Sequence, residues 1–251
     1  MKIGVLGMGI GKIFAKVCKK LGYEPLVFDT ERKKCQGFQF EPELIKKCDY
    51  IIVCLPDFLH YPVTKRLLKK KKNVLLVKPA TGDFKKLKEL YRLAIKKNVI
   101  FKVALNNRFR KEIPQKSWDV FKGEWFGSLN KVPRWRKKND FWLDLGIHLL
   151  DLYLFSFSQR RNIRYKGIFQ IGYVKNKDSY LRIKWFKNKE IVSEIFDGIK
   201  GRFNDEYTFE ACVKDWLQTK ETKEDKIFLK ILKDIKVLLK QKNVAQAQLE
   251  P

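Results

Sequence analysis

The sequence has little of what membrane proteins, disulfide-rich secreted proteins and metal-binding proteins require. No uninterrupted apolar run approaches the roughly 18–20 residues of a membrane-spanning helix, and Lys12 and Lys16 interrupt the N-terminus where a secretory signal would lie. The 5 cysteines are scattered without a Cys-x-x-Cys pair, and their odd number argues against a disulfide framework. Because there are only 2 histidines, no metal site is expected. We therefore expect a cytoplasmic protein that does not bind a membrane.

Acidic residues are also few relative to basic ones. The 55 lysines and arginines against 28 aspartates and glutamates give a formal net charge of +27. Such a charge attracts nucleic acids, anionic lipids or anionic metabolites. The lysines, however, are spread between apolar positions along every expected helix, and no nucleic-acid-binding motif is present. We expect a lysine-rich surface and no specific nucleic-acid partner, while basic segments such as the one around Arg134 favour an anionic substrate.

Apolar strands and amphipathic helices alternate along the first half of the chain. The length of 251 residues suits one large domain or two modest ones. Such alternation predicts an α/β fold with a parallel sheet and helices on both of its faces. The expected strands are Lys2–Gly7, Pro25–Phe28, Tyr50–Cys54, Asn73–Val77 and Val99–Leu105, and the expected helices are Ile13–Leu21, Leu44–Lys47, His60–Lys70 and one capped by Asp83 that runs to Lys97.

A glycine-rich turn separates the first strand from the first helix. This order of strand, glycines and helix is that of a dinucleotide site, in which Gly7 permits a tight turn and Gly9 lets the backbone approach a pyrophosphate. The N–H groups at the start of the helix, next to Ile10 and Gly11, would hold the negative charge. Asp29 ends the second strand and is placed to accept hydrogen bonds from a ribose.

The glycine spacing and the cofactor choice each leave two interpretations open. In the usual Gly-x-Gly-x-x-Gly spacing the third glycine would stand at Lys12, one residue later than Gly11. Either the turn is one residue shorter, or Lys12 adds a cation near the phosphates. Asp29 should repel a 2′-phosphate and so favours NAD, whereas the basic residues 32–34 lie close enough in sequence to accommodate NADP.

The second half changes character. A basic, tryptophan-rich segment follows Gly123, and three strand-like stretches come later, with polar turn residues between them. We expect these stretches to be antiparallel neighbours. They are Gly167–Val174, Tyr180–Phe186 and Ile191–Phe196, and two helices, Thr208–Thr219 and Asp225–Lys242, then close the chain.

A helix expected over Phe141–Phe155 carries a second group of polar residues. Asp144, His148 and Asp151 follow the i, i+4, i+7 spacing that places side chains on one helix face. A neighbouring leucine stripe can pack into a core. Gly146 interrupts the helical run, at a cost of about 1 kcal/mol relative to alanine. A close approach by cofactor, substrate or backbone would explain that glycine.

Taken together, these fragments resemble the Gfo/Idh/MocA oxidoreductase family, which contains glucose–fructose oxidoreductase and inositol dehydrogenase. The order and spacing of the fragments carry the resemblance, and both histidines fall at family positions. The matching fragments are Gly7-Met-Gly9, Pro56-Asp-Phe-Leu-His60, Val77-Lys78-Pro79, Asn106-Asn-Arg-Phe109 and Asp144-Leu-Gly-Ile-His148-Leu-Leu-Asp151.

The resemblance implies an N-terminal Rossmann domain over residues 1–108 and a smaller α+β domain over residues 109–244 with an open, mostly antiparallel sheet. Residues 245–251 would form a frayed tail. It also implies a homo-oligomer, a dimer or higher. By carry-over, the dinucleotide would contact the glycine turn and residues at the strand ends. These residues are Gly7, Gly9, Ile10, Gly11, Asp29, Pro56, His60, Lys78 and Asn106, with His60 either structural or next to the cofactor.

The implied activity is an NAD(P)-dependent dehydrogenase or reductase that acts on a CH–OH group of a sugar, cyclic polyol or nucleotide-linked sugar. Lys78, Asp144 and His148 would be the catalytic residues and, with Arg134, would bind the substrate. A neutral imidazole is a natural base for a hydroxyl proton, so His148 would be the base. Lys78 would stabilise the reacting oxygen, and Asp144 or Asp151 would orient the histidine or hold a substrate hydroxyl.

A second hypothesis is that the protein has the same fold but does not catalyse a reaction. Val77 stands where the family has glutamate, which removes a carboxylate that could tune Lys78. The second domain is also expected to be shorter than is usual in the family. Both departures favour a non-catalytic dinucleotide-binding sensor or regulatory protein, whereas the intact set of Lys78, Asp144 and His148 favours the enzyme.

Overall fold

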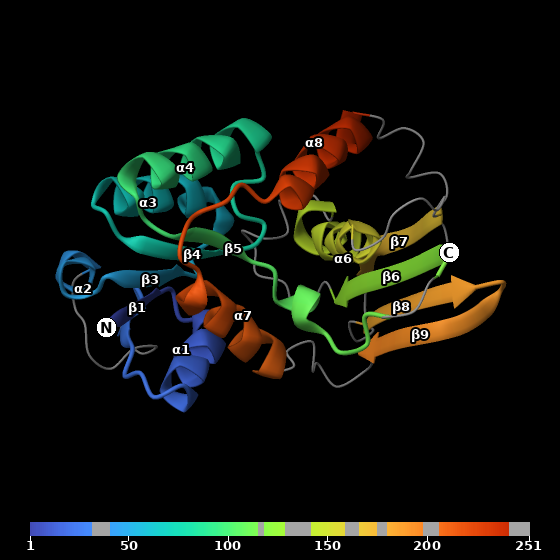
Figure 1. Cartoon of the computed structure of the whole chain (residues 1–251), viewed down its shortest axis with the longest axis horizontal. Helices are drawn as coiled ribbons and strands as arrows, with labels where there is room; N and C mark the ends of the chain where they lie inside the picture. Colours follow the sequence, from blue (N-terminus) through green and yellow to red (C-terminus); the bar gives the residue numbers. More distant parts are fainter. Residues whose placement is uncertain are drawn as a thin grey trace. The chain divides into compact units, whose positions relative to one another are not determined.

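The computed structural model describes residues 1–31, 41–114, 118–128, 142–158, 166–174, 180–197 and 206–240. The chain divides into two compact units, the first made of Met1–Asn106 and Glu206–Asp225, the second of Asn107–Asp205 and Lys226–Pro251 (Figure 1). Within the described ranges, none of the helices combines the length and the apolar composition that crossing a bilayer requires.

The first unit is built on a five-stranded sheet in which every pair of neighbours is parallel, as the alternation of elements predicts. The strand order is β2-β1-β3-β4-β5, so the chain leaves β1 toward β2 and then crosses back to the other side of β1. In open parallel sheets, ligands bind beyond the carboxyl ends of the strands at such a reversal. The strands are β1 (Ile3–Leu6), β2 (Leu26–Phe28), β3 (Tyr50–Val53), β4 (Asn73–Val77) and β5 (Phe101–Ala104).

Helices cover both faces of this sheet. A Cβ atom on Gly4 would meet Leu44 of α2 (Glu41–Lys47), whereas the next residue, Val5, lies against Gly11 of α1 (Gly11–Lys20). Successive strand residues point to opposite faces, so α1 and α2 lie on opposite sides. Figure 1 shows α3 (Asp57–Lys69) and α4 (Phe84–Lys97) on the face opposite α1. Asp83 caps α4, as expected, by accepting a hydrogen bond from the N–H of Lys86.

Helix α7 (Glu206–Gln218) packs on α1 in the first unit, although the expected division placed it in the second domain. The physical reason is its apolar face. The rings of Phe14 and Phe209 meet edge to face with centroids 5.1 Å apart, and buried Trp216 lies 5.3 Å from the ring of Tyr50. Farther on, the Thr222 hydroxyl donates to Val99 and accepts from the N–H of Phe101, at the start of β5.

The second unit holds a four-stranded sheet of order β7-β6-β8-β9, which corrects the expected pairing. The hairpin of β8 (Tyr180–Lys187) and β9 (Glu190–Asp197) is antiparallel as predicted, with φ of 52° and 70° at Asn188 and Lys189 in its two-residue turn. Strand β7 (Lys166–Val174), however, pairs in parallel with β6 (Val120–Ser128). The sequence predicts a basic segment over part of β6 and no strand there. Strand β6 therefore separates β7 from β8.

The expected helix over Phe141–Phe155 is two elements. A π-helical turn, η4 (Trp142–Gly146), ends at the glycine that interrupts the pattern, and α6 (Ile147–Ser158) follows. The predicted leucine stripe packs on the sheet. Helix α8 (Lys226–Lys240) lies beside α6. The core of the unit contains Trp118, Phe121, Trp125, Leu145, Leu149, Leu152, Ile171, Leu181, Ile183, Trp185 and Ile195.

Candidate dinucleotide site and active site

The turn after β1 has room only for glycine at its first position. Gly7 has φ of +89°, and a Cβ atom there would lie 2.6 Å from the carbonyl oxygen of Cys54. The N–H of Gly7 donates to Phe28 (2.8 Å), at the end of β2. The turn is therefore held between β2 and β3, the two strands that flank β1.

Gly11 performs the packing role of the third glycine one residue early. A Cβ atom there would lie 3.0 Å from Cγ1 of Val5 and 3.4 Å from Cβ of Cys54, so α1 approaches the sheet as closely as a glycine allows. Helix α1 begins at Gly11, and Lys12 is exposed. Of the two interpretations of the spacing, the structure supports the shorter turn.

The space above the turn fits a pyrophosphate. A Cβ atom on Gly9 would meet nothing within 4 Å, in contrast to those on Gly7 and Gly11. Ile10 precedes α1 without a side-chain cap, and the first turn of this helix contains no acidic residue. The N–H groups of an uncapped helix start bind anions. The residues present therefore fit the phosphates of a dinucleotide.

Asp29 lies against this turn. Its Oδ2 accepts a hydrogen bond of 2.6 Å from the N–H of Met8, and its Oδ1 accepts one of 2.9 Å from the N–H of Glu31. Each carboxylate oxygen has a second lone pair, so Asp29 can also accept from ribose hydroxyls. The basic residues 32–34, on which the NADP alternative depends, lie outside the described residues.

His60 joins the two loops that follow β3 and β4. Its Nδ1 lies 2.8 Å from the carbonyl oxygen of Ala80 and its Nε2 lies 2.7 Å from that of Leu55, and the side chain is 1% exposed. Burial lowers the pKa of His60 below its ordinary value; the nearby Lys78 lowers it further, while the two carbonyls and Asp57 oppose the shift. These contacts give His60 a structural role, and its position next to the cofactor stays a prediction.

Lys78 and Asn106 follow β4 and β5 at the same edge of the sheet. Lys78 is half-buried and precedes Pro79 through a cis peptide bond. The buried amide of Asn106 donates to the Thr208 hydroxyl of α7 at 3.2 Å. Pro56 directly precedes α3. Together with the glycine turn and Asp29, these residues line the carboxyl edge where a ligand of a parallel sheet binds.

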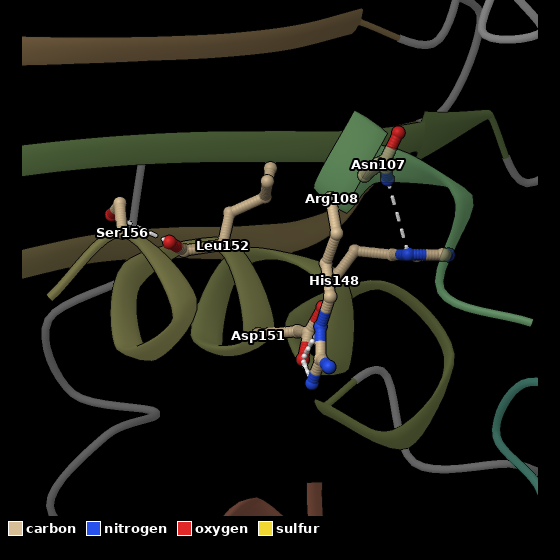
Figure 2. Close-up of polar contacts among 6 residues, drawn as sticks. All are labelled: Asn107, Arg108, His148, Asp151, Leu152 and Ser156. Carbon is tan, nitrogen blue, oxygen red and sulfur yellow. Dashed lines mark hydrogen bonds and ion pairs between the residues drawn. The ribbon is translucent and has the colours of Figure 1, made fainter. Parts of the chain in front are cut away.

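The second unit presents His148 from the first turn of α6. The residue is 7% exposed, and its ring stacks on Trp125 with a centroid distance of 4.9 Å. Its Nδ1 lies 3.2 Å from Nδ2 of Asn107 (Figure 2). The Oδ1 of Asn107 accepts from Nε of Arg110 at 3.2 Å. The residue that orients this side of His148 is thus Asn107, which sequence analysis quoted only as part of a motif.

Asp151 is bound by a different residue. Nε of Arg108 donates to both of its carboxylate oxygens, at 3.0 and 2.9 Å, and Asp151 is 2% exposed (Figure 2). A buried carboxylate needs such a paired charge. That Asp144 or Asp151 orients His148 stays a prediction. The side chain of Asp144 and all of Arg134 lie outside the described residues.

Comparison with known proteins agrees with the sequence motifs. Residues 2–105 match the profile of the Gfo/Idh/MocA family, described as an oxidoreductase family with an NAD-binding Rossmann fold. Over 61 residues the chain is 38% identical to an uncharacterized oxidoreductase of Schizosaccharomyces pombe. That stretch is 24% of this chain and spans only 16% of the relative's length.

Solved structures share the fold over nearly the whole chain. UDP-N-acetylglucosamine 3-dehydrogenase GnnA from Acidithiobacillus ferrooxidans has a TM-score of 0.72 at 16% identity, covering 95% of this chain and 96% of its own. Scyllo-inositol dehydrogenase from Lactobacillus casei, with bound NAD(H) and scyllo-inositol, has a TM-score of 0.68 at 15% identity, covering 97% of each chain. At these identities the likeness shows the fold alone.

The parallel sheet, its glycine turn and the profile match over residues 2–105 define an NAD-binding Rossmann fold in the first part of the chain. Residues 2–105 thus match the Gfo/Idh/MocA oxidoreductase family, as the motifs predict.

Proposed function

We propose that this protein is an NAD-dependent dehydrogenase or reductase acting on a CH–OH or carbonyl group of a sugar, a cyclic polyol or a nucleotide-linked sugar. The glycine turn carries the proposal, since Gly9 leaves open space beside an uncapped helix start while Asp29 lies against the same turn. The printed substrates of GnnA and scyllo-inositol dehydrogenase favour a sugar-like substrate. The net charge of +27 favours an anionic one.

When bound, NAD would accept or deliver a hydride at its nicotinamide ring. The protein must then stabilise negative charge on the reacting oxygen and move one proton. Lys78, at the carboxyl end of β4, and His148, buried beside Trp125, are the residues proposed for these two tasks. Asp144 is proposed as the third member of this catalytic set.

A second candidate function is a dinucleotide-binding sensor without turnover. Val77 favours it, because this residue, at the end of β4, offers no carboxylate beside Lys78. Both candidates predict that NAD binds. They differ in whether a bound nicotinamide is ever reduced or oxidised.

One experiment separates the two candidates. The full chain is mixed with a stoichiometric amount of NAD and a panel of polyols and nucleotide sugars, including scyllo-inositol and UDP-N-acetylglucosamine, and nicotinamide reduction is followed by absorbance. Reduction that is lost in Lys78→Ala and His148→Ala and kept in the exposed control Lys85→Ala supports the enzyme. Tight binding of NAD without reduction by any compound supports the sensor.

We also propose that two copies associate through the second sheet. On β9, Ile191, Val192 and Phe196 are large apolar residues that are 50%, 37% and 51% exposed. Edge strands with exposed apolar residues favour association. Sedimentation should show a dimer that Phe196→Lys weakens; a monomer at all concentrations would contradict this part of the proposal.

A further inference from the structure

We propose that Asn107 and Arg110 hold neutral His148 in the tautomer with its proton on Nε2, so that His148 acts as a hydrogen-bond donor to the substrate oxygen and does not serve as the base. The inference deepens the proposed function and rests on it for the identity of the reaction. The tautomer itself follows from three neighbouring side chains of the second unit.

The orientation of the Asn107 amide is decided by Arg110. A guanidinium only donates hydrogen bonds, and Nε of Arg110 lies 3.2 Å from the Asn107 side chain. The atom facing it must therefore be the amide oxygen, because a flipped amide would set two donors against each other. Both side chains are buried, at 4% exposure for Arg110 and 5% for Asn107, so water cannot readily relieve such a clash.

The amide orientation in turn decides the protonation of His148. With its oxygen committed to Arg110, Asn107 presents its NH₂ group, which only donates, to Nδ1 of His148 at 3.2 Å (Figure 2). Nδ1 must therefore carry a lone pair. In a neutral imidazole the proton then resides on Nε2.

The same contacts disfavour the imidazolium form. A proton on Nδ1 would point at the Asn107 NH₂ group, which offers it no acceptor. The His148 ring stacks on Trp125 at an interplanar angle of 27°, which fixes the plane of the ring in which Nδ1 faces Asn107. The carboxylate of Asp151, one turn along α6, is compensated by Arg108.

In the proposed reaction, His148 and Lys78 therefore have different roles. His148 donates its Nε2–H to the reacting oxygen and stabilises negative charge there, without gaining or losing a proton. In alcohol oxidation, for which bound NAD would supply the hydride acceptor, the hydroxyl proton would pass to the neutral amine of Lys78, which becomes an ammonium group. Carbonyl reduction is the reverse, with the proton returned from the Lys78 ammonium. This exchanges the roles that sequence analysis expected for Lys78 and His148.

Nitrogen NMR of the full chain tests the tautomer without requiring activity. The chain has 2 histidines, so imidazole-labelled protein gives two sets of signals, and His60→Gln identifies those of His148. The expected result near neutral pH is a protonated Nε2 and an unprotonated Nδ1. A protonated Nδ1 in the unsubstituted protein would overturn the proposal.

Asn107→Asp tests the cause of the tautomer, because a carboxylate of the same size accepts where the amide donates. We expect the proton of His148 to move to Nδ1 and the pKa of His148 to rise, while Asn98→Asp, an exposed control, changes neither. An unchanged tautomer in Asn107→Asp would overturn the role of Asn107. Asn107→Ser, in which a hydroxyl can donate or accept, provides a second variant if the aspartate does not fold.

Turnover tests the role in the reaction separately. Because one positioned donor to a developing oxyanion typically contributes about 100-fold or more, Asn107→Asp should lower kcat by about 100-fold while leaving the affinity for NAD within about twofold. If no substrate is turned over, the proposed function fails while the NMR result still stands. If Asn107→Asp changes the tautomer and kcat is unaffected, the donor role of His148 is wrong.

Discussion

The carboxylate of Asp29 accepts a hydrogen bond of 2.6 Å from the backbone N–H of Met8, which ties the end of β2 to the glycine turn after β1. This contact positions the carboxylate beside the space that Gly9 leaves open. It also gives Asp29 a part in shaping the turn in addition to its proposed contact with ribose.

Asp29→Asn separates these two parts. The amide oxygen can still accept from Met8, which keeps the tie to the glycine turn, whereas the NH₂ group cannot accept from Glu31 and the negative charge that repels a 2′-phosphate is lost. We expect the dissociation constant for NAD to rise about 10-fold, equivalent to about 1.4 kcal/mol, and the preference for NAD over NADP to shrink. Titration calorimetry with both nucleotides measures this. Unchanged affinities would mean that Asp29 does not contact the cofactor.

Gly7→Ala and Gly9→Ala form a matched pair within one turn. At Gly7 the added methyl would lie 2.6 Å from the Cys54 carbonyl oxygen on a backbone with φ of +89°. We expect Gly7→Ala to lower the free energy of unfolding by about 2–4 kcal/mol.

Gly9→Ala should leave stability within about 0.5 kcal/mol, because the added methyl would meet no atom within 4 Å. It should nevertheless weaken NAD binding, since the methyl occupies the space proposed for the pyrophosphate. Denaturant unfolding and NAD titration of both variants are the measurements. Equal losses of stability would contradict this account of the turn.

Phe209→Ala should destabilise the first unit. Phe209 is 4% exposed and packs against Phe14 of α1, so its removal leaves a cavity and should cost about 3–5 kcal/mol. The control is Lys214→Ala on the same helix, which removes an exposed ion pair with Glu210 and should cost under about 1 kcal/mol. Comparable effects of the two substitutions in thermal unfolding would show that α7 does not support this unit.

His60→Gln should reduce the sensitivity of the fold to mild acid. Burial lowers the pKa of His60 in the folded state. As pH falls through the ordinary histidine value of about 6.5, the unfolded chain therefore takes up a proton that the folded chain does not. Stability should drop by up to about 1.4 kcal/mol per pH unit below that value. Urea unfolding at pH 7.5 and 5.5 compares the two proteins, and an equal pH dependence in the variant would contradict the prediction.

Much of the first unit could be predicted from the sequence because its signals are local. Buried parallel strands appear as short apolar runs, and Asp83 before a helix marks a cap whatever the chain does elsewhere. Gly7 and Gly9 indicate the shape of the turn from the sequence alone. The backbone conformation that Gly7 permits and the open space that Gly9 leaves depend on only a few neighbouring atoms. Lys78 could be assigned to a strand end for the same reason.

The remaining features depend on contacts between residues far apart in the chain. Periodicity identifies β7 and β8 as strands but cannot show that β6 pairs between them, since pairing is decided by which faces share the core around Trp185. The sequence shows that α7 has an apolar face but not which unit that face packs on. The contacts with Phe14 and Tyr50 place α7 on the first unit.

The sequence by itself determined the dinucleotide-binding half of this protein, since apolar periodicity and the steric demands of glycine act within a few residues. Only the tertiary structure decided what surrounds His148. Whether an imidazole donates or accepts depends on the atoms within hydrogen-bonding distance, and folding brings Asn107 to this one from 41 positions away in the chain.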